Sequence, residues 1–313
     1  MHPAKPLQAV RESAAFVARR ARYVRVQEDA IAAFADRVAA GEMPRIEWDE
    51  EHHFRDGGPA TAHYLLVLDA LNFCFWPEPS WNYNRLALAL KQSMLNEPER
   101  FDAARLASAS EADVRTMLGG SDDIPLLGQR VALLREVGAV LSARWQGQAA
   151  NLIRAADHSA SDLVALATAE FPGFRDHAIY QGWPIYLYKR AQILAGDLWG
   201  SFDGQGLGRF DDIDQLTMFA DYRVPQLLRG EGILEYNTRL ASIVDLCREL
   251  PSGSDLEIEI RAASIHAVEL LRDALAARDI QISALELDWI LWNEGEAQQQ
   301  ELKPHHRTLT IYY

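Results

Sequence analysis

The chain has 313 residues, 49% of them hydrophobic, so it can bury a large core and is not disordered. Its 31 Lys and Arg residues are outnumbered by 45 Asp and Glu, and the net charge of −14 argues against a protein that binds along a nucleic-acid backbone. Cys74 and Cys247 are the only cysteines and have no paired spacing, which supports neither a disulfide framework nor a cysteine zinc site.

No segment has the pattern of an export signal or a membrane span. Residues 1–20 lack a long apolar run followed by a small-residue cleavage site, and no stretch approaches about 18 consecutive apolar residues. We therefore expect a soluble, cytoplasmic protein with no membrane partner.

Helical spacing dominates the chain. Apolar residues recur three and four apart in three segments, which predicts helices over 24–39, 122–147 and 161–170. Residues 42–59 are expected to form a long surface loop. Ser254 followed by Glu257 predicts a capping box that opens a long helix, on which Glu257 and Arg261 form a structural pair. The terminal RTLTIYY alternates, which predicts one or two short strands. The fold class is therefore mainly α and compact, with a few short strands.

A cluster of aromatic residues surrounds Asn72 in the segment LDALNFCFWP. Phe73, Phe75 and Trp76 occupy three of four positions, so they cannot all face one core, and some are expected to line a cavity. A wide hydrophobic wall beneath a loop is the alternative.

The segment WPIYLYKRAQILAGDLW predicts a helix in which Pro184 occupies the first turn. Helical spacing then places four residues on one face, namely Tyr186, Lys189, Ile193 and Asp197. A lysine in this position is either a solvated or snorkelling residue or part of a site.

The segment TMFADYRVPQ places one acid between an apolar helical run and a proline. Val224 precedes proline and is expected outside helical geometry, while Pro225 suits the first turn of the next helix. Asp221 is therefore expected at a corner between two helices, near the amide-rich start of the second, where a carboxylate is favoured. A simple cap or an ion pair with Arg223 is the alternative.

Two pairs of adjacent histidines, His52–His53 and His305–His306, do not predict a metal site. Adjacent residues do not share a face of a helix or strand, and no carboxylate lies at a recognised ligand spacing. We expect no metal and no cofactor.

Several segments together resemble the queuosine salvage proteins, the queuosine 5′-monophosphate N-glycosylase family. In chain order these segments are LNFCFWP, FPGFRD, YKRAQILAGDLW, MFADYRVPQLL, EIEIRAASIHAVELLRD, LDWILWN and PHHRTLTIYY. The resemblance covers about 64–313, and 1–60 match only loosely. We expect one domain over 1–313.

This resemblance implies a helical hydrolase that releases queuine base from queuosine 5′-monophosphate without a cofactor. Proteins of the family have been compared with helix-hairpin-helix DNA glycosylases. The order of Lys189, a glycine-rich loop at 204–208 and Asp221 is similar to the lysine, glycine hairpin and aspartate of those enzymes, although the separation is longer here.

Breaking a base-to-ribose bond passes through an oxocarbenium-like sugar, which a fixed carboxylate stabilises. The family resemblance implies that Asp221 has this role and can orient or deprotonate water. Lys189 is the partner, either as a donor to base, ribose or water or as the charge that keeps Asp221 ionised. Tyr222 beside Asp221 can limit water.

Substrate-binding roles follow from the same reading. Asn72 and Phe73 would read and stack the base, and Asp197 would hold a ribose hydroxyl or the cyclopentenediol. Positive charge for the phosphate would come from one or more of His53, Arg175 and Arg223.

Two other functions remain open. A DNA or RNA base glycosylase fits a helical architecture, although the acidic balance disfavours nucleic-acid binding. A non-catalytic binder of queuine or a related nucleotide would use the same aromatic pocket, and only turnover separates it from an enzyme.

Overall fold

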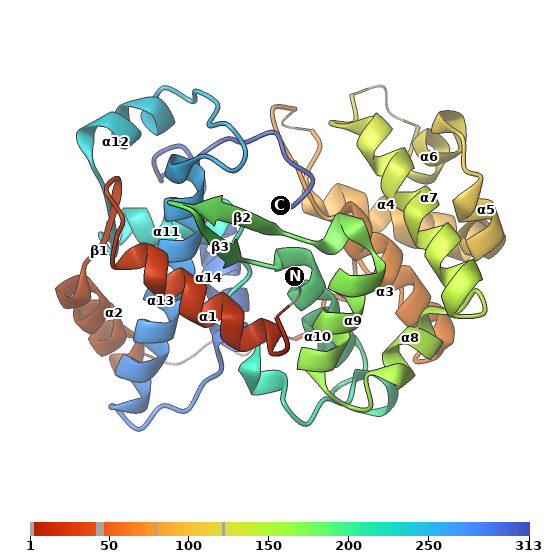
Figure 1. Ribbon diagram of the computed structural model, residues 1–313, viewed down its shortest axis with the longest axis horizontal. Helices are drawn as coiled ribbons and strands as arrows, with labels where there is room; N and C mark the ends of the chain where they lie inside the picture. The colour runs from red at the N-terminus through yellow and green to blue at the C-terminus, as the bar shows by residue number, and fades with distance from the viewer. Residues whose placement is uncertain (1–2, 42–46, 79, 121–122) are drawn as a thin grey trace.

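The computed structural model describes residues 3–41, 47–78, 80–120 and 123–313 (Figure 1). The helices of the first half are α1 (Pro6–Ala18), α2 (Glu28–Ala40), α3 (Pro59–Leu71), α4 (Tyr83–Asn96), α5 (Ala103–Ala107), α6 (Glu111–Met117) and α7 (Leu127–Arg144). Those of the second half are α8 (Ala149–Ala155), α9 (Ala160–Glu170), α10 (Lys189–Ser201), α11 (Arg223–Gly230), α12 (Thr238–Asp245), α13 (Asp255–Ala276) and α14 (Ala284–Ala297). Short 3₁₀ helices cover Pro98–Phe101, Pro172–Phe174, Gly206–Gly208 and Ile213–Gln215. The predicted mainly α class is confirmed.

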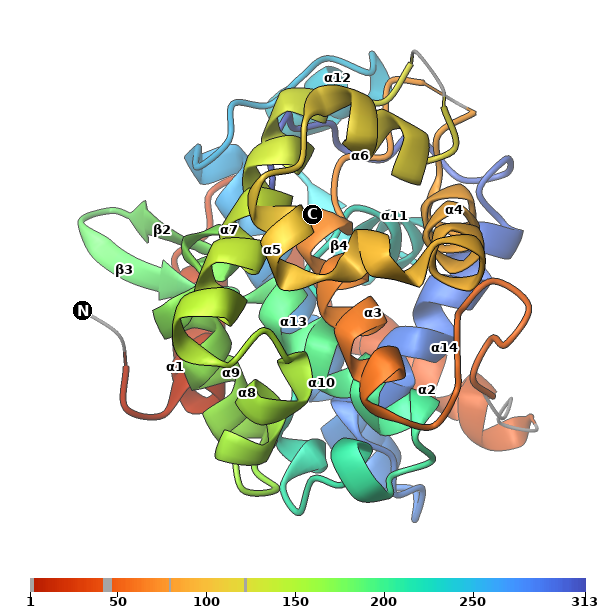
Figure 2. The same cartoon turned by 90° about the vertical axis from the view of Figure 1, so that its right-hand side faces the viewer.

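Four short strands form two small antiparallel sheets in the described part of the chain. Strand β1 (Val24–Val26) pairs with β4 (Leu234–Tyr236), which joins the first fifth of the chain to its last third. Strands β2 (His177–Tyr180) and β3 (Trp183–Tyr186) form a hairpin that projects from the body of the molecule (Figure 2). Its two-residue turn has positive φ at both residues, Gln181 and Gly182, as tight hairpins require.

The helix predictions are confirmed over 127–144 and 160–170 but need correction at the first segment, where 24–26 form a strand and the helix begins at Glu28. Residue 122 lies outside the described residues. Ser254 does accept from the N–H of Glu257, at 3.4 Å. Of the predicted loop, 47–58 contain no helix or strand, and 42–46 lie outside the described residues.

The helix predicted from Pro184 is wrong. Pro184 lies in β3 opposite Ile179, and the helix begins only at Lys189. Hairpin pairing has overridden the local signal, because an edge strand tolerates a proline that lacks an N–H.

The two helices predicted around Asp221 are only half correct. Residues 216–221 are not helical, whereas Val224 lies inside α11 with Pro225 in its first turn. The steric bias of a residue before proline is therefore overcome here by the surrounding fold.

The strands predicted at the C-terminal segment are also wrong. Arg307 makes one isolated bridge with Glu249, and the backbone carbonyl of Tyr313 accepts from the N–H of Cys74 at 2.9 Å. Apart from this bridge, residues 307–313 take part in no strand pairing with the described residues.

The helices pack in two groups around α10 and α14. Helices α3 to α8 lie together on the right of Figure 1, and α1, α2, α12 and α13 lie on the left. Helix α10 packs against α3 and α9, while α14 packs against α11 and α13. Within the described residues no helix combines the length and apolar character needed to cross a bilayer.

Two buried arginines fix the C-terminal end of α3. Arg130 of α7 donates to the carbonyls of Leu71 and Phe73, each at 2.6 Å. Arg190 of α10 donates to the carbonyls of Asp69 and Ala70. Their guanidinium groups lie 4.3 and 5.3 Å from the centre of the Phe73 ring. Carbonyls that the helix leaves without partners are thereby satisfied, and the turn after α3 is held rigidly.

Candidate active site

A cavity of about 910 Å³ lies beside α10, α11 and α14. Its wall is built from residues of 47–53, 72–78, 81–84, α10, 219–226, α14 and the terminal segment 302–313. Seven of the nine residues predicted for the site line it, namely His53, Asn72, Lys189, Asp197, Asp221, Tyr222 and Arg223. Most of the residues predicted for the site therefore lie on this wall.

Lys189 is the first residue of α10 and is 4% exposed. Its Nζ lies 3.3 Å from the carbonyl oxygen of Asn72 and 3.4 Å from the side-chain oxygen of the same residue. Burial lowers the pKa of Lys189 to about 8, and Asp221 is the main group that opposes this shift. The ammonium group is therefore close to its titration range at neutral pH. Lys189, Ile193 and Asp197 share a face of α10 and all three line the cavity, whereas Tyr186, the fourth residue predicted for this face, lies in β3 and does not line it.

Asp221 accepts two backbone hydrogen bonds at the start of α11. Its Oδ1 receives the N–H of Arg223 at 2.9 Å and the N–H of Val224 at 3.1 Å. Burial raises the pKa of Asp221, while Lys189 and these amides favour its ionised form. One oxygen of Asp221 therefore caps the start of α11, as the alternative interpretation predicted. The residue also lines the cavity, as Lys189 does.

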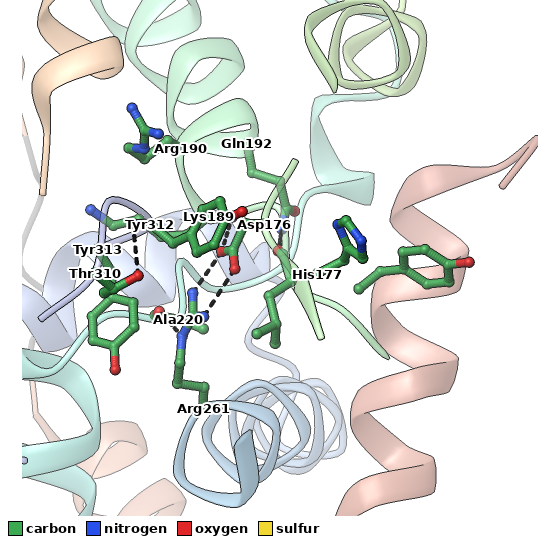
Figure 3. A network of polar contacts seen from close by, with 12 residues as sticks. Asp176, His177, Lys189, Arg190, Gln192, Ala220, Arg261, Thr310, Tyr312 and Tyr313 are labelled. Atoms are coloured by element: carbon green, nitrogen blue, oxygen red, sulfur yellow. Dashed lines mark hydrogen bonds and ion pairs between the residues drawn. The ribbon is translucent and has the colours of Figure 1, made fainter. Parts of the chain in front are cut away.

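A buried ion pair links the backbone of Lys189 to that of Ala220, the residue before Asp221 (Figure 3). Arg261 of α13 contacts both oxygens of Asp176 at 3.0 and 2.6 Å. Asp176 accepts the N–H of Lys189 at 3.1 Å, and Arg261 donates to the carbonyl of Ala220 at 2.8 Å. The pair therefore fixes the start of α10 relative to the residue that precedes Asp221.

The predicted structural pair on α13 is confirmed. Glu257 and Arg261 lie 3.4 Å apart, and both are almost completely buried. Arg261 therefore has two acidic partners, which the burial of its charge requires.

Three further acids surround Lys189, and the sequence analysis had assigned a role to only one of them. Asp197 lines the cavity from α10, Asp69 lies behind it on α3, and Asp288 lines the cavity from α14. Asp288 accepts the N–H of Phe219 at 2.7 Å. Burial raises the pKa of Asp197 to about 7 and the pKa values of Asp69 and Asp288 well above the usual range.

Phe73 does not line the cavity, so its predicted stacking role needs correction. The ring is fully buried between Arg130 and Arg190. Phe75 and Trp76, from the same aromatic cluster, do line the cavity, as expected of some of its members.

The aromatic wall of the cavity extends beyond this cluster. Phe75 packs edge-on against Tyr83 with ring centres 6.2 Å apart, and Tyr83 packs edge-on against Trp292 at 5.9 Å. All three rings line the cavity. Such a wall suits a flat heterocycle.

Arg175 also lies away from the cavity. Its guanidinium donates to the carbonyls of Thr168 and Ala169 at 2.7 and 2.6 Å, near the end of α9. It caps that helix, so its predicted role as a phosphate ligand needs correction.

His53 lines the cavity but is a poor source of positive charge. Its Nε2 lies 2.8 Å from the hydroxyl of Tyr83, and burial lowers the pKa of His53. Arg223 is already paired, since its Nε contacts Glu296 at 2.6 Å.

Arg307 was missed by the sequence analysis. It lines the cavity beside Trp76, with its guanidinium 5.9 Å from that ring, and its Nε has no hydrogen-bond partner among the described residues. His305 also lines the cavity and stacks on Tyr222 at 4.3 Å. Arg307 opens the segment for which strands were expected, and this expectation concealed its position.

Comparisons with known proteins show the family of this chain. The family model described as queuosine salvage protein matches residues 52–313. A queuosine 5′-phosphate N-glycosylase/hydrolase from Dictyostelium discoideum is 43% identical over 98% of this chain and 99% of its own length. A protein of the same name from Sphaerobacter thermophilus is 45% identical over 95% of both chains, and one from Mus musculus is 33% identical over 98% of this chain and 99% of its own.

Proposed function

Because this chain belongs to the queuosine salvage protein family, we propose that it hydrolyses the N-glycosidic bond of queuosine 5′-monophosphate and releases queuine for tRNA modification. The observation that carries the proposal is that Asp221 and Lys189, whose charges influence each other, both line a cavity of about 910 Å³. A cavity of this size suits a nucleotide-sized ligand.

Asp221 stabilises the positive charge that develops on the sugar. Two backbone amides orient its Oδ1, so the carboxylate needs no rearrangement as the bond to the base breaks. Lys189 keeps it ionised by its charge, and Asp221 accepts a proton from the attacking water.

The base stacks on the aromatic wall formed by Phe75, Tyr83 and Trp292, whose rings line the cavity. Asn72 lies beside Lys189 and reads an edge of the base with its amide. Asp197 and Tyr222 complete the substrate contacts.

The 5′-phosphate binds at the end of the cavity formed by Arg307, Arg223 and His305. Arg307 is the principal ligand because it lines the cavity and its Nε has no hydrogen-bond partner among the described residues. Arg223 contributes charge but shares its donors with Glu296 and Gln226.

Residues 1–313 act as one domain in this proposal. The main hydrophobic cluster includes residues from Leu7 to Leu291, and β1 pairs with β4. The net charge of −14 supports a free nucleotide rather than a nucleic acid as the substrate, and the predicted cytoplasmic location suits salvage. The likeness to helix-hairpin-helix glycosylases stays a prediction.

The test is to incubate the purified chain with queuosine 5′-monophosphate, queuosine and guanosine 5′-monophosphate and to quantify free base by mass spectrometry. Queuine release that is fastest from the monophosphate supports the proposal. Binding without release would favour a non-catalytic binder. Release of base from DNA or RNA oligonucleotides alone would favour a nucleic-acid glycosylase.

A further inference from the structure

Two buried carboxyl groups meet on the wall of the cavity. Asp197 of α10 is 6% exposed and Asp69 of α3 is fully buried, and the two carboxyl groups lie close enough for each to affect the ionisation of the other. Neither oxygen of Asp69, nor Oδ2 of Asp197, has a well-formed hydrogen bond from an N–H or O–H group of the described residues. Two carboxylates at this depth cannot both be ionised without donors, so the pair must carry at least one proton.

The groups that face this pair leave that proton in place. On α10, Lys189 favours ionisation of both acids and Arg190 favours ionisation of Asp69, yet burial is the larger influence on each. Asn72 favours ionisation of Asp69 as well. The other titratable groups around the pair are neutral or acidic, namely Tyr64 of α3, Tyr83 of α4 and Asp288 of α14.

The proposed reaction needs such a proton. A 7-deazaguanine base has carbon where guanine has N7, so the usual protonation site of a departing guanine is absent. The bonding electrons of the C–N bond must still leave with the base, and a proton donor lowers the cost of that charge.

We propose that Asp197 is the acid that protonates a nitrogen of the departing base, and that Asp69 is a positioning residue that keeps the proton on the pair. This inference rests on the proposed function. As the C–N bond breaks and its electron pair moves to the base, the proton passes from Asp197 to the base. Water forms the new C–O bond and gives its proton to Asp221. That proton then returns to the pair through solvent, so the enzyme ends as it began.

The first test is the pH dependence of queuine release under single-turnover conditions. In the parent, the rate should fall as pH rises through about 7, where Asp197 loses its proton. Asp69→Asn replaces the neighbouring acid with an amide, and an amide that donates to Asp197 favours its ionised form. The descending limb of the pH–rate profile should move to lower pH by about one unit or more. The rate of this variant at pH 8 should therefore fall about tenfold or more and recover in acid. Asp197→Asn should lose about 100-fold or more at every pH.

Asp288→Asn is the matched control, because Asp288 is also a buried acid on the cavity wall but has its own backbone donor. It should leave the descending limb where it is in the parent. An unmoved limb in folded Asp69→Asn, or the same shift in Asp288→Asn, would overturn the inference.

A second test needs neither substrate nor a variant with full activity. Difference infrared spectroscopy of the parent between pH 5 and 9 should show a protonated carboxyl band that disappears through about pH 7, and Asp197→Asn should lack it. Absence of this band in the parent would overturn the inference even if Asp69→Asn does not fold. A parent that shows the band but releases no queuine would instead contradict the proposed function.

Discussion

Asp221 is subject to two opposing influences. Burial favours its neutral form, whereas Lys189 and the two amides at the start of α11 favour its charge. A carboxylate held in this balance responds strongly to a cation that forms beside it, because little water is present to screen the interaction. Its effect should therefore appear in the reaction step more than in binding.

Asp221→Asn should lower single-turnover queuine release by about 100-fold or more, since it removes one main electrostatic stabiliser. The asparagine oxygen can still accept from Arg223 and Val224, so the fold should persist. Queuine affinity, measured by calorimetry, should remain near that of the parent. Near-parental turnover in a folded variant would reduce Asp221 to a helix cap.

Arg307→Ala should lower kcat/KM for queuosine 5′-monophosphate by about 10- to 100-fold, the range for a lost charge-assisted hydrogen bond. It should leave kcat/KM for queuosine almost unchanged, because the nucleoside has no phosphate. Steady-state kinetics with both substrates test this. Equal losses on the two would show that Arg307 supports the cavity wall and does not bind the phosphate.

At the scale of elements, the close approach of α5 and α7 depends on one glycine. A Cβ on Gly138 would overlap backbone atoms of Ala103 and Ala107 and lie 2.8 Å from the carbonyl carbon of Leu106. Helix α7 also carries Arg130, which caps α3. A shift of α7 would therefore reach the turn that contains Asn72.

Gly138→Ala should lower the free energy of unfolding by about 1–3 kcal/mol or more, because the backbones must separate. Gly128 lies on the same helix, and a Cβ added there would meet no described atom within 4 Å, so Gly128→Ala is the matched control. It should be neutral or stabilise by up to about 1 kcal/mol. Urea denaturation measures both, and equal effects would contradict the role given to Gly138.

The sequence predicted what depends on local spacing and missed what depends on distant partners. Lys189, Ile193 and Asp197 recur four apart and do share a face, and Asp221 does precede a helix start. Asp69 was missed because it stands in an apolar run with no periodicity to mark its partner, Asp197, far along the chain. Pro184 misled because the pairing of its strand is a property of the hairpin and not of the residue.

For the whole molecule, two buried groups, His305 and Asp197, affect the pH dependence of stability with opposite sign. Burial lowers the pKa of His305 to about 4, so the unfolded chain binds more protons there and stability falls as pH decreases below about 6.5. Asp197 has its pKa raised to about 7, so the folded chain binds more protons and stability falls as pH rises from about 4 to 7. The two contributions partly cancel.

Asp69→Asn should remove the contribution of Asp69, whose pKa burial raises well above the usual range. Relative to the parent, the free energy of unfolding of this variant should then rise by about 1 kcal/mol for each pH unit between 5 and 7, since the proton that Asp69 carries is lost from the folded state. Urea denaturation at several pH values measures the slope. Parallel curves for the two proteins would show that the pair does not hold its proton when folded.

The pairing of β1 with β4, and the cavity wall drawn from residues as far apart as Trp48 and Arg307, have a consequence for biosynthesis. On the ribosome, α3 emerges long before α10, α14 and the segment that follows them. Until those arrive, Asp69 and its neighbours face solvent as ordinary ionised carboxylates, and they take up their protons only when the later helices cover them. Completion of the cavity therefore coincides with an uptake of protons late in translation, and a nascent chain arrested before α14 should bind no queuine.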